Sequence, residues 1–171
     1  MEIAIIKYNA GNVQSVMYAL DRIGVKYHWT DDEKTIQSAD KVIFPGVGEA
    51  STAMAYLREK GLDQLIPSLK QPVLATCIGM QLLCKESEEN NTTCMGVFDV
   101  SVKRFISTDL KIPHVGWNSI EAQGENALMQ GLKKEEYVYF VHSYYAPLNP
   151  YNRATFYGGN EKGYTDYPTL S

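Results

Sequence analysis

The stretch QPVLATCIGMQLLC, residues 71–84, predicts a short buried strand that turns sharply into a helix. Residues 73–74 form the apolar run of the strand, and Cys77 lies at the turn. Ala75 and Gly79 flank the cysteine two positions before and two positions after it. Small residues at this spacing are typical of a nucleophile elbow, where strand and helix approach too closely for larger side chains.

Cys77 is therefore a candidate nucleophile. At a helix N-terminus we expect the dipole and the unpaired N–H groups to lower the pKa of its thiol and to hold an oxyanion. A buried small hydrophobic residue is the alternative, and the spacing alone leaves both equally open. Gln81, four residues on, lies on the same helix face and could reach whatever Cys77 attacks, unless it is an ordinary solvated residue.

Length and composition predict one globular domain. The chain has 171 residues, of which 44% are hydrophobic and 21% are charged, enough for one buried core. Its net charge of −4 and the absence of a basic stripe argue against a nucleic-acid surface. The sequence has no basic leader and no membrane-length apolar run, so we expect a cytoplasmic protein. Cys77, Cys84 and Cys94 lack CxxC spacing, so we expect no disulfide, no metal and no cofactor.

The first 70 residues alternate between strand and helix patterns. This alternation indicates a doubly wound α/β fold, with a mostly parallel sheet and helices on both faces. Gly24 is placed to end the first helix. The predicted strands cover residues 3–7, 25–29 and 41–44, and the predicted helices cover 13–23, 31–39, 49–60 and 62–69.

The loop Pro45-Gly46-Val47-Gly48 follows the third predicted strand directly. Ligand sites in parallel sheets lie beyond the carboxyl ends of the strands, so we expect this loop and Cys77 to belong to one site. The glycines allow backbone N–H groups to turn inward, which suits an oxyanion donor opposite the N–H of Ile78. An ordinary turn is the alternative.

The pattern changes after Cys84. Pro113 and Gly116 interrupt residues 111–120, which we expect to form an exposed, shaped loop. Its Trp117 is equally a partner anchor or a buried core residue. We further predict a polar loop at 86–93, strands at 97–100, 102–106, 136–147 and 153–157, and a helical turn at 127–132.

Four motifs together resemble a family, the glutaminase subunits of imidazole glycerol phosphate synthase, which are class I (triad) glutamine amidotransferases. The resemblance runs over the whole chain. The elbow alone indicates only the superfamily, whereas the remaining strings are specific in combination. The motifs are YNAGN at residues 8–12, PGVG at 45–48, the Cys77 elbow, and HVGWN at 114–118 with YFVHSY at 139–144.

The resemblance implies a flavodoxin-like fold and a cysteine glutaminase. Cys77 would attack the carboxamide of glutamine, release ammonia and form a thioester that water hydrolyses to glutamate. The ammonia would pass to a (β/α)8-barrel cyclase partner. By the same resemblance the oxyanion donors are Gly46, Val47, Gly48 and Ile78, the substrate ligands are Gln81, Ser143 and Tyr144, and the residues that face the partner are Asn9, Asn12, His114, Trp117, Asn118 and Tyr139.

One departure from the family concerns the general base. The family carries it in a His-Pro-Glu motif on a late strand, and these 171 residues contain no such sequence. Of the three histidines, His28 lies in the second predicted strand as a packed or surface residue, and His114 and His142 match other motifs. We expect the chain to end before the C-terminal strand and helix, and to be a poor or inactive glutaminase by itself, slower by roughly 10²- to 10⁴-fold. The first elbow position is Ala75 where the family has glycine.

Two other functions stay open. A non-catalytic interaction subunit could stabilise the cyclase through Trp117 and Tyr139, and the missing base favours this possibility. A stand-alone cysteine hydrolase would use His142 as its base, but the PGVG and HVGWN strings argue against it.

Overall fold

The computed structural model describes residues 1–9, 12–108, 110–120, 131 and 136–147. The chain divides into two compact units, Met1–Val102 and Lys103–Ser171, and each is described by itself. The strand predicted at 153–157 lies outside the described residues, as does the helical turn predicted at 127–132 apart from residue 131.

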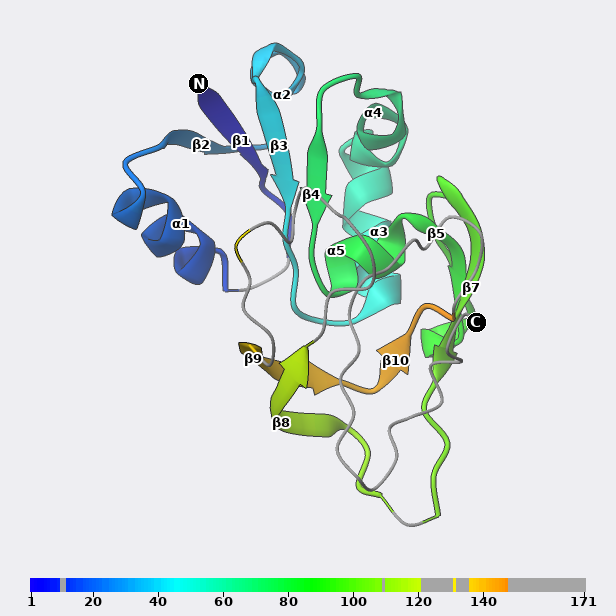
Figure 1. Ribbon diagram of the computed structural model, residues 1–171. Coiled ribbons are helices and arrows are strands. Elements are labelled where there is room, and N and C mark those ends of the chain that lie inside the picture. Colours follow the sequence, from blue (N-terminus) through cyan, green and yellow to red (C-terminus); the bar gives the residue numbers. More distant parts are fainter. Residues whose placement is uncertain (10–11, 109, 121–130, 132–135, 148–171) are drawn as a thin grey trace. The chain divides into compact units, whose positions relative to one another are not determined.

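The first unit is built on a parallel sheet in the order β2-β1-β3-β4 (Figure 1). Its middle strands are the apolar ones because a parallel strand covered on both faces has no solvent side. This confirms the predicted mostly parallel sheet. The strands are β1 Glu2–Ile6, β2 Lys26–Thr30, β3 Lys41–Phe44 and β4 Val73–Ala75.

Helices cover both faces of this sheet, as predicted. Successive side chains of a strand point to opposite faces, so Ile3 and Ile5 pack with α1, whereas Ala4 and Ile6 pack with the other helices. In Figure 1, α3 and α4 lie on the opposite side of the strands from α1. The helices are α1 Val13–Arg22, α2 Glu33–Ser38, α3 Ala50–Glu59, α4 Leu62–Ser68 and α5 Ile78–Leu82.

Two expectations about the stretch after β3 need correction. The strand before Cys77 is not fully buried: β4 pairs only with β3 among the described strands, and Leu74 is 46% exposed. The polar run 86–93 is not a loop. It belongs to β5 Cys84–Ser87, the short 3-10 helix η1 Glu89–Asn91, and β6 Thr92–Thr93.

Backbone pairing explains why this polar run forms strands. β5 pairs antiparallel with β6 and parallel with the first part of β7 Phe98–Arg104. The buried hydroxyl of Thr92 donates to the carbonyl of Glu89 (2.6 Å), so this polar side chain has a hydrogen-bond partner although it is buried. β7 is one strand, where two were predicted at 97–100 and 102–106, because Ser101 is an outward-facing residue between buried Val100 and Val102.

The second unit contains an antiparallel pair, β8 His114–Ile120 and β9 Glu136–His142. β10 Tyr144–Tyr145 pairs antiparallel with Arg104 and Lys103 at the end of β7. The expected loop at 111–120 is therefore wrong from His114 onward. Pro113 precedes β8, where no ladder N–H is needed, and Gly116 keeps its place in the strand at a φ of 149°.

None of the helices in the described part of the chain is long and apolar enough to cross a membrane.

Candidate functional site

Cys77 lies between the end of β4 and the start of α5, in a strained backbone conformation. Its φ of 53° and ψ of −122° lie outside the regions that residues with a Cβ normally adopt. Such strain at the turn from a strand to a helix is typical of a nucleophile elbow. Cys77 is exposed, whereas Cys84 and Cys94 are buried, so the alternative of a buried core cysteine does not hold for Cys77.

Close packing between the elbow and β3 explains why the residue two positions after Cys77 is a glycine, Gly79. A Cβ on Gly79 would lie 2.1 Å from the carbonyl oxygen of Phe44. The N–H of Thr76 donates to that same oxygen (3.1 Å), and Ala75 pairs with Phe44 in the sheet. The elbow is therefore held directly against the carboxyl end of β3, with no space for a side chain at position 79.

The glycine loop that follows β3 also lies against the elbow. A Cβ on Gly46 would overlap the side chain of Ile78, the first residue of α5, and the hydroxyl of Tyr8. Gly48 has a φ of 130°, which favours glycine. The structure thus brings the loop and Cys77 together at the carboxyl ends of β3 and β4, where the sequence predicts one site.

The expected low pKa of the Cys77 thiol is wrong. Although the residue is exposed, nearby protein atoms remove part of the water from around its sulfur, and this desolvation raises the pKa of the thiol above its usual value. The negative charge of Glu89 raises it further. The hydrogen bond from the Ile78 N–H lowers it, but does not compensate. α5 has only five residues, so its dipole is small. The reactive thiolate consequently needs a proton acceptor or a nearby positive charge.

Glu89, a carboxylate that acts on Cys77, could not be predicted from the sequence. Its side chain accepts a hydrogen bond from the N–H of Ala50 at the start of α3 (2.8 Å). Burial raises the pKa of Glu89, and the neighbouring Glu49 raises it further. The sequence predicts a loop at residues 86–93, and only the pairing of β5 with β6 shows that Glu89 is carried back toward the elbow.

Glu49 is the N-cap of α3 and stays ionised. Burial would raise its pKa, but hydrogen bonds from the N–H groups of Ser51 and Thr52 and from the Asn90 amide lower the pKa to about 2. Two carboxylates therefore lie at the start of this helix, and their pKa values are shifted in opposite directions, down for Glu49 and up for Glu89.

Gln81 is buried, with 5% of its surface exposed, so it is not an ordinary solvated helix residue. Its backbone N–H donates to the carbonyl of Cys77 (3.1 Å), which places it one turn along α5. Asn9 and Asn12 lie in the exposed loop between β1 and α1. Asn9 donates to the carbonyl of Thr52 (3.2 Å), and Asn12 accepts from the hydroxyl of Ser15 (2.8 Å).

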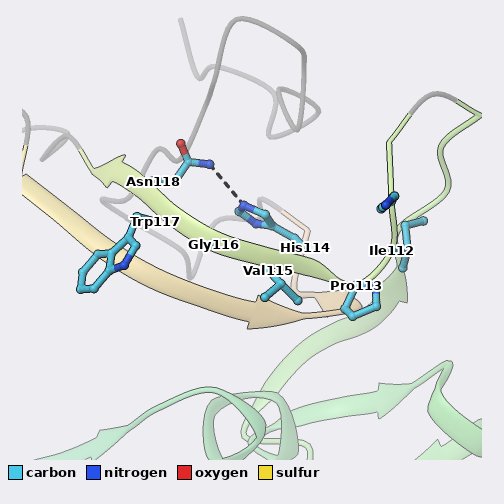
Figure 2. A pocket seen from close by; sticks show the side chains of 8 residues that line it. Ile112, Pro113, His114, Val115, Gly116, Trp117 and Asn118 are labelled. Carbon is cyan, nitrogen blue, oxygen red and sulfur yellow. Dashed lines mark hydrogen bonds between the residues drawn. The ribbon is translucent and has the colours of Figure 1, made fainter.

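In the second unit, β8 and β9 present an exposed aromatic face. Trp117 is 68% exposed and meets Tyr139 edge-on, with ring centroids 5.5 Å apart, so Trp117 is not a core residue. Figure 2 shows Val115 and Trp117 on the opposite side of β8 from His114 and Asn118. A hollow of about 440 Å³ runs along residues 111–118. The aromatic face, as we call it below, consists of Val115, Trp117, Tyr137, Tyr139 and Val141.

The other side of this strand pair carries a hydrogen-bonded histidine pair. His142 Nδ1 lies 3.0 Å from the carbonyl oxygen of Tyr144, and because a carbonyl only accepts, this nitrogen donates. In neutral His142 the other nitrogen then accepts from His114 Nδ1 (3.4 Å). His114 Nε2 in turn accepts from the Asn118 amide (3.3 Å).

This pairing bears on three sequence-based expectations. Both ring nitrogens of His142 are engaged, which argues against its use as the base of a stand-alone hydrolase. His114 and Asn118 are buried in their own unit, 8% and 6% exposed, so their side chains do not form part of the aromatic face. His28 is a surface residue, 3.6 Å from Glu2.

Ser143 and Tyr144 follow β9, and both are half-buried. The carbonyl of Ser143 accepts from the N–H of Phe105 (2.9 Å). These two residues belong to the second unit, whereas Cys77, the glycine loop and Gln81 belong to the first.

The sequence is also similar to known proteins. The sequence matches the family "Glutamine amidotransferase class-I" over residues 4–163. It is 52% identical over 156 residues to the imidazole glycerol phosphate synthase subunit HisH of Bacteroides fragilis, covering 90% of this chain and 79% of that protein. It is 39% identical over 165 residues to the subunit HisH 1 of Vibrio vulnificus, covering 93% and 81%.

Solved structures share the fold. One described as a glutamine amidotransferase has a TM-score of 0.63 at 20% identity, covering 83% of this chain and 71% of that one. Another, described as part of a putative GMP synthase from Thermoplasma acidophilum, has a TM-score of 0.59 at 18% identity, covering 85% and 66%. At such low identity these likenesses bear on the fold alone. With the sequence matches, they lead to one conclusion: the chain belongs to the class I glutamine amidotransferases, among the HisH subunits of imidazole glycerol phosphate synthase.

Proposed function

We propose that the chain is the glutaminase subunit that hydrolyses glutamine through a Cys77 thioester and supplies ammonia to a (β/α)8-barrel cyclase in histidine biosynthesis. The observation that carries this proposal is the strained, exposed Cys77 at an elbow whose next residues, Ile78 and Gly79, lie against the glycine loop. The Cys77 sulfur attacks the carboxamide carbon, the C–N bond breaks, and the amide nitrogen takes up the proton lost by the thiol and leaves as neutral ammonia. Water then attacks the thioester, which releases glutamate and restores the thiol.

Backbone N–H groups would stabilise the two tetrahedral intermediates. The N–H of Ile78 belongs to the residue that follows Cys77, and its interaction with the sulfur lowers the pKa of the thiol. The N–H groups of Gly46, Val47 and Gly48 lie in a loop that touches α5, so they can supply the opposing donor. Donors of this kind are worth roughly 10²- to 10³-fold each in rate.

Substrate recognition would combine charge and hydrogen bonds. An amino-acid substrate carries an ammonium group, and the Glu89 carboxylate beside Cys77 is the charge that can bind it. Gln81, buried on α5, and the Ser143 and Tyr144 segment complete the set that we assign to glutamine by resemblance.

The general base is not assigned to any residue of this chain. The raised pKa of Cys77 means that a thiol proton must be removed, and these 171 residues hold no His-Pro-Glu sequence. We therefore propose that the 171 residues by themselves hydrolyse glutamine roughly 10²- to 10⁴-fold more slowly than a relative that carries the motif. A parallel assay of glutamate release would test this, and equal rates would show that another group serves as the base.

The aromatic face is the surface that we assign to the cyclase. It exposes three aromatic rings, of which Trp117 and Tyr139 contact each other, and aromatic residues of this kind dominate the binding energy of interfaces. Because His114 and Asn118 are buried behind it, we now propose that they support the face and do not touch the partner. A closed interface would also keep ammonia unprotonated, and hence nucleophilic, on its way to the cyclase.

The test compares Cys77→Ala with Cys94→Ala in complex with the cyclase. Cys77→Ala should abolish glutamate release, whereas Cys94→Ala removes a buried thiol outside the site and should retain it. If Cys77→Ala hydrolyses glutamine as fast as the unmodified subunit, the thioester mechanism is wrong.

A non-catalytic interaction subunit is the second candidate, because the aromatic face is well formed while the thiol is held protonated. It predicts tight binding to the cyclase without labelling of Cys77 by a glutamine-like electrophile. Selective labelling of Cys77 by that electrophile would exclude the non-catalytic function.

A further inference from the structure

Two adjacent residues at the end of β1, Tyr8 and Asn9, hold both ends of the segment that contains the glycine loop. The Tyr8 hydroxyl donates to the carbonyl of Pro45, 2.6 Å away, at the start of the loop. The Asn9 amide donates to the carbonyl of Thr52, 3.2 Å away, in the first turn of α3. Both acceptors are main-chain atoms, so these bonds fix the path of the backbone between them.

Tyr8 is buried and tightly enclosed. Its side chain is 6% exposed, and its ring packs against Phe44, with centroids 5.3 Å apart. The Gly46 Cα lies so close to the hydroxyl that no Cβ would fit at position 46. The hydroxyl therefore lies between the carbonyl of Pro45 and the backbone of Gly46, and the surrounding residues leave it little room to move.

The hydroxyl is also within electrostatic reach of the nucleophile. Burial raises the pKa of Tyr8 well above its usual value, and a negative charge on Cys77 raises it further. The phenol consequently keeps its proton, and thus its donor, throughout the working pH range. A neutral phenol is only a very weak base, so Tyr8 is not the group that removes the proton of Cys77.

Peptide geometry connects this hydrogen bond to the oxyanion donors. The peptide group that joins Pro45 to Gly46 is planar, so its C=O and its N–H point in opposite directions. A hydroxyl that fixes the direction of the Pro45 carbonyl therefore also fixes the direction of the Gly46 N–H. Glycine alone would leave this peptide free to rotate, because it lacks a Cβ to restrict it.

We propose that Tyr8, assisted by Asn9, is a positioning residue that fixes the orientation of the 46–48 loop and so prepares its N–H groups for the oxyanion. This inference rests on the proposed glutaminase function. Tyr8 does not contact the substrate in this proposal. It supports the loop from β1, which the motif around Cys77 does not indicate.

The test is Tyr8→Phe in the subunit complexed with the cyclase, with glutamate release from glutamine as the readout. Phenylalanine keeps the ring against Phe44 and removes only the hydroxyl. We expect kcat to fall roughly 10- to 100-fold, less than the loss of a whole oxyanion donor, and KM to stay within about twofold. Asn9→Ala should lower kcat less, because its hydrogen bond is exposed.

A second readout separates positioning from a general loss of structure. Alkylation of Cys77 by iodoacetamide displaces iodide directly and needs no oxyanion donor. Its rate in Tyr8→Phe should stay within about twofold of that of the unmodified subunit, since only the loop N–H groups are disturbed. Tyr18→Phe is the matched control, because Tyr18 is 59% exposed on α1 and loses the same hydroxyl without effect on either readout.

The two readouts together decide between positioning and a structural role. A loss of kcat with unchanged alkylation supports the proposal. Unchanged kcat in Tyr8→Phe, or an equal loss of kcat and alkylation, overturns it, since the first shows no positioning and the second shows a merely structural role. If the unmodified complex releases no glutamate, or if Cys77→Ala is equally active, the proposed function itself is wrong, and the positioning role falls with it.

Discussion

Gly79→Ala tests whether the close approach of the elbow to β3 positions Cys77. A Cβ at position 79 would lie 2.1 Å from the Phe44 carbonyl oxygen, 3.0 Å from its carbon and 3.1 Å from the Pro45 oxygen. Ordinary contact begins at about 3.4 Å, so the helix start and the strand end must separate by roughly 1.3 Å. All three neighbours are backbone atoms, which cannot rotate away as a side chain would. We expect unfolding to become easier by about 3 kcal/mol, as for overpacking of a core.

The same displacement should impair the chemistry more than the stability. A misplacement of about 1 Å between the reacting groups can cost roughly 100-fold in rate, so kcat for glutamine should fall by about that factor. Denaturant unfolding and steady-state glutamate release measure the two effects. Gly24→Ala is the control, because Gly24 has a φ of 67° with open space around it, and it should lose about 1 kcal/mol of stability with unchanged kcat. A Gly79→Ala subunit that unfolds and reacts like the unmodified one would refute the argument.

Three further predictions concern charge and the aromatic face. Glu89→Gln should lower the pKa of Cys77 by removing a negative charge, so iodoacetamide should alkylate Cys77 faster at a pH below that pKa. Burial lowers the pKa of both His114 and His142, so the unfolded state binds more protons, and the melting temperature should rise with pH from about 5 to 7. Trp117→Ala should weaken binding of the cyclase by about 2 kcal/mol, or roughly thirtyfold, as measured by calorimetry.

Each of these predictions has a matched comparison. Glu59→Gln removes an exposed carboxylate on α3 and should leave the alkylation rate unchanged. His114→Gln is the comparison for the pH prediction, because it removes one of the two rings whose pKa is lowered by burial and should flatten the slope of melting temperature against pH. Trp29→Ala removes a half-exposed indole of the first unit, so equal losses of affinity in Trp29→Ala and Trp117→Ala would contradict a specific aromatic face.

The first 83 residues could be predicted from the sequence because their apolar spacing is strong. β1 and β3 are nearly continuous apolar runs, and α1 and α3 repeat at helical intervals, so local pattern and final burial agree. β5, β6 and β8 could not be predicted in this way. Their residues are polar or interrupted by Gly116, and only pairing with another strand makes them extended.

Within the candidate site, the sequence predicted which backbone positions lie in contact. It did not predict which charged and polar side chains act on Cys77 and on the glycine loop. Gly79 and Gly46 are small because a Cβ would overlap the Phe44 carbonyl at position 79 and the Tyr8 and Ile78 side chains at position 46, and such steric demands leave a local signature in the sequence. Glu89 and Tyr8 act on Cys77 and on the loop across distances of many residues, and nothing near them in the chain marks this. The expected effect of the helix N-terminus on the thiol failed for the same reason, because it considered α5 without its neighbours.

Geometry and acidity at Cys77 therefore oppose each other. The turn that exposes Cys77 still leaves its sulfur partly desolvated by nearby protein atoms, and this desolvation is the largest cause of its raised pKa. The second cause, the charge of Glu89, is one that a bound ammonium group would neutralise. An amino-acid substrate that binds there would remove part of the opposition to thiolate formation at the moment when the nucleophile is needed. An isolated site would keep its thiol protonated, which favours hydrolysis of bound glutamine over unselective reaction with other electrophiles.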